Sequence, residues 1–170
     1  MANTTYAEVY DAFLASITDD MYISWTKEDT YADLFPLLKS AIVRFFMPRE
    51  DLRSVSSDYG EPCFTCKLSY DTINLLVLLM TREWLARQMN TVRIVQTQLT
   101  GSDAKAINTK QQAEAVKIAQ EANAAAISRA YHDYEYQTVD EESKQTRVSD
   151  LDLSSGSTSS IKTRGRYRVG

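Results

Sequence analysis

The longest apolar pattern in the chain lies in the stretch YDTINLLVLLMTREWLARQM, residues 70–89. Its apolar positions follow helical spacing on two faces, Ile73, Leu76, Val77, Met80 and Trp84 on one, and Leu75, Leu78, Leu79, Leu85 and Met89 on the other. A helix that is apolar on two faces packs against partners on both sides. The stretch therefore predicts the central helix of a small all-α bundle, with Ser69 as its N-cap.

This central helix is not expected to cross a membrane. A membrane-spanning helix needs about 20 predominantly apolar residues. Here the uncharged run ends at Thr81, before Arg82 and Glu83. The pattern favours a core helix of a bundle without membrane contact.

Two further helices are predicted before the central one. Residues 6–17 carry an apolar stripe, and Thr5 with Glu8 forms a capping box. Residues 32–46 form a second amphipathic helix, in which Pro36 is compatible only with the first turn and Pro48 follows the end. The stripes comprise Tyr6, Val9, Tyr10, Phe13, Leu14 and Ile17, then Leu34, Leu37, Leu38, Ala41, Ile42 and Phe45.

The segments between these helices carry weaker patterns. Alternation of Met21, Ile23 and Trp25 predicts an extended linker after the first helix. Residues 48–67 are rich in charge, serine and turn signals, which indicates a loop. Residues 91–99 form a separate short amphipathic piece, which ends at the break around Gly101.

A long alanine-rich helix is predicted over residues 109–134. Alanine favours helix strongly but buries little area, which suits a surface helix or contact between subunits. Composition changes after Gln137, and SSGSTSS at residues 154–160 is a flexible spacer. We therefore expect a helical core, residues 1–137, and an extended C-terminal tail, residues 138–170, that only partners order.

Composition and charge narrow the function. With 19 basic and 23 acidic residues the net charge is −4, so the chain as a whole is not built to bind nucleic acid. The two cysteines do not suggest a disulfide framework and suit a reducing cytoplasm. The N-terminal residues lack the basic and apolar pattern of a signal peptide.

No pattern of catalytic, cofactor-binding or metal-ligating residues stands out. Cys63 and Cys66 form one CxxC, whereas structural zinc needs four ligands and His132 is far away in sequence. His132 also lacks a partnered nucleophile at helical spacing. The acidic clusters, Glu28, Asp29 and Asp33, then Asp140, Glu141 and Glu142, are better explained as solvated charge than as a metal site. The sequence predicts a protein that is not an enzyme and has no cofactor.

The C-terminus is the one strongly basic segment. Three interpretations stay open for it: docking on an acidic partner surface, which we favour, nucleic-acid binding, and a solvated tail. Alternation of side chains also allows strand addition to a partner's sheet edge. The predicted partner-binding residues are Lys162, Arg164, Arg166, Tyr167, Arg168 and Val169.

Residues 5–137 resemble a family of small tailed-phage proteins, the head–tail connector proteins, also called adaptor or head-completion proteins. The resemblance rests on the order and spacing of three places in the chain: YAEVYDAFLASITD followed by a helix of the type DLFPLLKSAIVRF, then LSYDTINLLVLLMTREWLARQMN, and last ISRAYHDYEYQ. The long helix is richer in alanine and the C-terminal extension is longer than in the family.

The resemblance implies a helical bundle that forms a ring, typically twelve-fold, in the phage neck. Such a ring binds the portal protein above and tail or tail-completion proteins below, and DNA passes through its channel without specific binding. The implied location is the virion, after synthesis in the cytoplasm of a host bacterium. The alternative is a helical regulatory or DNA-binding protein of phage or bacterial origin that uses the basic tail.

Overall fold

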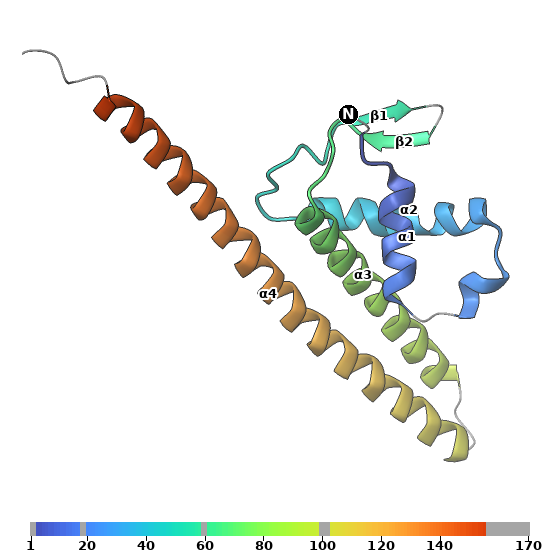
Figure 1. The fold of residues 1–170 in the computed structure, drawn as a ribbon. Helices are drawn as coiled ribbons and strands as arrows, with labels where there is room; N and C mark the ends of the chain where they lie inside the picture. Colours follow the sequence, from blue (N-terminus) through green and yellow to red (C-terminus); the bar gives the residue numbers. More distant parts are fainter. Residues whose placement is uncertain (1–2, 18–19, 59–60, 99–102, 156–170) are drawn as a thin grey trace, which may run out of the picture. The chain divides into compact units, whose positions relative to one another are not determined.

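The computed structural model describes the backbone of residues 3–17, 20–58, 61–98 and 103–155, and side chains within 3–17, 22–57, 62–96 and 109–136 (Figure 1). The described chain is mostly helical with one two-stranded sheet, which confirms the all-α class. It divides into two compact units, residues 1–132 and residues 133–170. The fold and the surfaces analysed below belong to the first unit.

Helix α1 (Tyr6–Ser16) begins and packs as its sequence predicts. The Thr5 side chain accepts a hydrogen bond from the Glu8 backbone N–H at 3.2 Å, which satisfies one of the free N–H groups at the helix start. Val9 and Phe13 have no exposed surface. The capping residue and the apolar stripe together fix the helix and the face that it buries.

The prediction for the next segment is wrong in two places. Residues expected to be extended form a short 3-10 helix, η1 (Asp20–Ser24). Helix α2 (Lys27–Arg44) begins a full turn earlier than predicted, because the Thr26 side chain caps it by accepting from the Asp29 N–H at 3.2 Å. Pro36 consequently lies inside the helix, on its exposed side, where the ring does not disturb the core.

The segment predicted as a loop contains a β-hairpin. Strand β1 (Val55–Asp58) pairs antiparallel with β2 (Glu61–Phe64), and the register places Ser57 opposite Pro62. The chain before α1 adds to this hairpin, since Thr4 C=O accepts from Phe64 N–H at 3.0 Å. Pro62 lies within β2 although proline has no N–H to donate to a ladder of hydrogen bonds.

Helix α3 (Tyr70–Gln98) is the core helix and contacts both α1 and α2. Ser69 Oγ accepts from Thr72 N–H at 3.3 Å, as the N-cap prediction required. The helix continues without interruption through residues 91–98, so the separate short piece predicted there is wrong. No helix within the described residues is long and apolar enough to span a membrane. The most deeply buried apolar side chains of α3 are Leu75, Leu76, Leu79 and Met80.

Helix α4 (Asp103–Ser155) is longer at both ends than predicted. Residues 138–155, expected to be an extended tail, are helical. This segment contains neither Gly nor Pro, and Glu141, Glu142, Lys144, Gln145 and Arg147 are residues of high helix propensity. Within the first unit, Asn123 Nδ2 donates to Leu78 C=O at 3.2 Å and Gln120 Nε2 donates to Leu85 C=O at 3.3 Å. These two bonds show that α4 runs antiparallel to α3.

Candidate interaction surface

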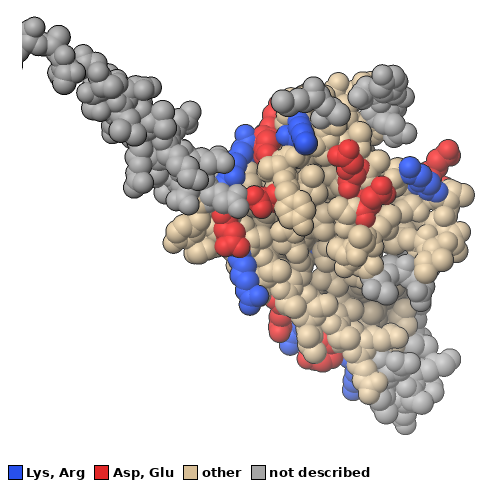
Figure 2. All heavy atoms as spheres, viewed as in Figure 1, with Lys and Arg blue, Asp and Glu red and all other residues tan. Residues whose placement is uncertain are grey.

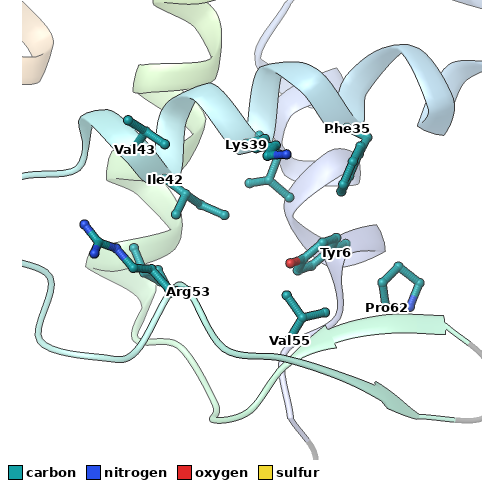
Figure 3. A pocket seen from close by; sticks show the side chains of 10 residues that line it. Tyr6, Phe35, Lys39, Ile42, Val43, Arg53, Val55 and Pro62 are labelled. Carbon is teal, nitrogen blue, oxygen red and sulfur yellow. The ribbon is translucent and has the colours of Figure 1, made fainter.

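An apolar groove lies between α2 and the hairpin, with the start of α1 at its base (Figure 3). It has a volume of about 540 Å³. Side chains from all three elements point into the same space in the close-up view. The lining residues are Tyr6, Phe35, Leu38, Lys39, Ile42, Val43, Leu52, Arg53, Val55 and Pro62.

The groove is apolar yet open to solvent. Val43 is 75% exposed and Val55 is 58% exposed. Phe46 and Met47, which follow the end of α2, are also exposed. Met47 has φ 49°, a left-handed conformation that is uncommon for a residue other than glycine. An exposed apolar groove of this kind is typical of a site where another molecule binds.

Two cations flank the apolar floor of the groove. Lys39 comes from α2 and Arg53 from the segment before β1, and none of the lining residues is a carboxylate. Tyr6 packs against Phe64 with ring centroids 4.8 Å apart, and burial raises the pKa of its hydroxyl. Because Tyr6 stays neutral, the groove has positive charge at its edges and none at its base.

The predicted partner-binding residues of the basic tail lie outside the described residues. Cys63 and Cys66 do not form a metal site with a third His, Asp or Glu side chain among the described residues. Cys63 is buried in β2 and Cys66 is half-buried beyond it, both as free thiols. No group of three or more His, Cys, Asp and Glu side chains suited to a metal ion occurs in the described part of the chain. His132 lies on α4, whereas Cys63 lies in β2.

The first acidic cluster has structural roles that the sequence did not reveal. Asp33 Oδ1 and Oδ2 both accept from Arg87 Nη1 at 2.8 Å, and Tyr22 Oη donates to Oδ2 at 2.8 Å. Asp29 accepts from the Thr26 hydroxyl in the cap of α2. These bonds join η1, α2 and α3. The side chains of the second cluster, residues 140–142, lie outside the described set.

Sequence reasoning missed the groove. The stretch FPLLKSAIVRFFM carries apolar residues on more than one face, but only the face with Leu34, Leu38 and Ala41 was expected to be buried. Phe35 and Val43 lie away from that face. The signal was the same two-faced pattern that marked the central helix, and here the second face is exposed to solvent.

Comparisons with models of protein families, with curated proteins and with solved structures find no match to this chain.

Proposed function

We propose that the chain is a structural subunit of the tailed-phage neck, which forms a ring beneath the portal and joins head to tail. The open apolar groove carries this proposal beyond the sequence resemblance. A closed helical core with a large exposed apolar surface suits a protein whose role is to bind other proteins. A net charge of −4 suits a channel subunit, because DNA must slide past it without being held.

The exposed side of α4 supports this proposal over DNA recognition. Lys110, Glu114, Lys117 and Glu121 are exposed and alternate in sign along the helix, as the charges on that side of the molecule do in Figure 2. A helix that reads DNA carries clustered positive charge for the phosphates. The regulatory alternative therefore depends on the basic C-terminus alone.

The decisive experiment is electron microscopy of the full-length protein mixed with the portal protein of the same phage. The proposal expects rings stacked on one end of the portal. A matched sample lacking residues 161–170 is expected to keep its helix content by circular dichroism and to lose stable attachment. Attachment should also weaken partly when Arg164, Arg166 and Arg168 are changed to Ala, and weaken in raised salt.

Two outcomes would oppose the proposal. A full-length protein that never associates with portal would refute the neck assignment. Tight binding of duplex DNA that is lost on removal of residues 161–170 would favour the regulatory alternative, and its salt dependence would count the phosphate contacts. If infectious particles assemble without these residues, the tail does not bind a partner and is a solvated segment.

A further inference from the structure

A second exposed surface lies on α4, in the same unit as the groove. We call it the α4 outer face: Glu114, Ile118, Glu121, Ala122 and Ala125, all exposed. The opposite side of α4 carries Val116, Asn123 and Ile127, which pack inward. Ile118 is therefore turned away from the core, with 59% of its surface exposed.

The α4 outer face is complementary to the groove in shape and in polarity. Ile118 is an apolar projection flanked by small alanines, which allow close approach of another backbone. The groove offers an apolar hollow lined by Phe35 and Val43. A side chain that fills a well-packed pocket and loses its contact with water can supply much of the binding energy of an interface.

The two surfaces are also complementary in charge. Glu114 and Glu121 lie one turn before and one turn after Ile118 on the α4 outer face. Lys39 and Arg53 line the groove, and Asp51 lies near Arg53 just outside the groove lining. The other exposed charges near this face of α4 are Lys110 and Lys117 at its edge and Arg129, which lies about 16 Å along the helix from Ile118.

Other occupants of the groove fit less well. The chain's own basic end, with Lys162, Arg164, Arg166 and Arg168, would place like charge beside Lys39 and Arg53. A small molecule needs a cavity that buries most of its surface, whereas Val43 at the groove edge is 75% exposed. A second copy of this chain meets both the apolar and the charge requirement.

We propose that the α4 outer face of one copy docks into the groove of the next copy, with Ile118 entering the apolar hollow and the glutamates facing Lys39 and Arg53. The two patches differ, so the contact is head-to-tail and propagates around a closed ring. This inference rests on the proposed function, because it supplies the contact between neighbouring subunits of the neck ring.

The test measures the mass of the full-length protein by sedimentation over a range of concentrations at low salt. The native chain is expected to form species well above its monomer mass of 19.3 kDa. Ile118→Asp and Val43→Asp should each weaken association at least about ten-fold. Ile23→Asp is the matched control, since Ile23 is 81% exposed on η1 and outside both patches. Circular dichroism should show unchanged helix content in all three variants.

Charge reversal tests the direct contact. The Glu114→Lys, Glu121→Lys double variant and the Lys39→Glu, Arg53→Glu double variant should each associate less than the native chain, whereas the chain carrying all four changes should recover most of the association. A native chain that stays monomeric at about 100 μM, or reversals with no effect and no rescue, would overturn the proposed contact. Rings that still form on portal with those variants would preserve the neck assignment and reject this contact alone.

Discussion

Helices α3 and α4 lie side by side in the first unit, yet different forces hold them there. Helix α3 buries leucines and methionine on two faces, and each fully buried side chain of this size contributes about 1.5–3 kcal/mol. Among the described side chains of α4 that precede Tyr134, only Thr109, Asn123 and Ile127 are buried. An α-helix of high propensity can thus be long without being a main part of the core.

Polar bonds fix α4 where α3 uses apolar packing. Amide side chains of α4 donate to backbone carbonyls of α3, and Tyr131 Oη accepts from Phe46 N–H at 3.0 Å. Such bonds set register and spacing but each contributes only about 1 kcal/mol. Because α4 contacts the core through few side chains, its other side is exposed. We propose that this side binds a neighbouring subunit.

The largest expected effect comes from truncating the core helix. Leu76 has no exposed surface, so Leu76→Ala should lower the free energy of unfolding by about 2–5 kcal/mol. Urea unfolding at one fixed protein concentration measures the change, and Ile94→Ala is the control because Ile94 is 57% exposed on the same helix. If the Leu76 variant is as stable as the native chain, α3 is not held by apolar packing and does not differ from α4 in this respect.

The next largest effect concerns the ion pair between Asp33 on α2 and Arg87 on α3. Asp33→Ala removes both bonds from Arg87 and the bond from Tyr22, and should cost about 1–3 kcal/mol. The group is partly exposed, so solvent and added salt should reduce the cost. Glu28→Ala, at an exposed position of the same helix, should change stability little. Equal effects of the two substitutions would show that Asp33 is only solvated charge.

Sequence patterns predicted the elements that local chemistry decides. The Thr5 cap of α1 and the two-faced core helix both follow from residues within one or two turns. The missed features depend on partners distant in sequence. Pairing of the hairpin with Thr4 is set by tertiary packing, which periodicity alone does not contain. The buried face of α2 was predicted from its apolar stripe, and Leu34, Leu38 and Ala41 are buried there.

A smaller effect depends on pH and concerns the start of α3. Glu50 accepts from Ser69 N–H at 2.9 Å and from the Thr72 hydroxyl at 2.7 Å. Burial acts to raise the pKa of Glu50, but these bonds outweigh it, so the pKa of the carboxyl lies below its usual 4.5. The carboxylate therefore stabilises the fold above about pH 4.5, and this contribution disappears as the pH falls through the lowered pKa.

Glu50→Gln should lower the free energy of unfolding by about 1 kcal/mol at pH 7, and the difference from the native chain should shrink steadily below pH 4.5. Urea unfolding of both chains at a series of pH values measures it. A difference that stays constant down to pH 3 would mean that the charge of Glu50 plays no part in capping α3.

The smallest expected effect on global stability addresses α4 itself. Asn123 is buried, and its side-chain amide donates to the backbone carbonyl of Leu78 in α3. Asn123→Ala keeps helix propensity high and should weaken the attachment of α4 to α3 by about 0.5–1 kcal/mol.

The free energy of global unfolding by urea should barely change, because α3 and its neighbours carry most of the buried area. Hydrogen exchange should reveal the change instead: amides at residues 116–130 should exchange faster in the variant, while those at residues 75–80 stay unchanged. Ala125→Ser, on the α4 outer face, is the matched control and should leave both regions as they are. If residues 116–130 of the native chain exchange only through global unfolding, α4 is as firmly part of the core as α3, and the contrast between the two helices fails.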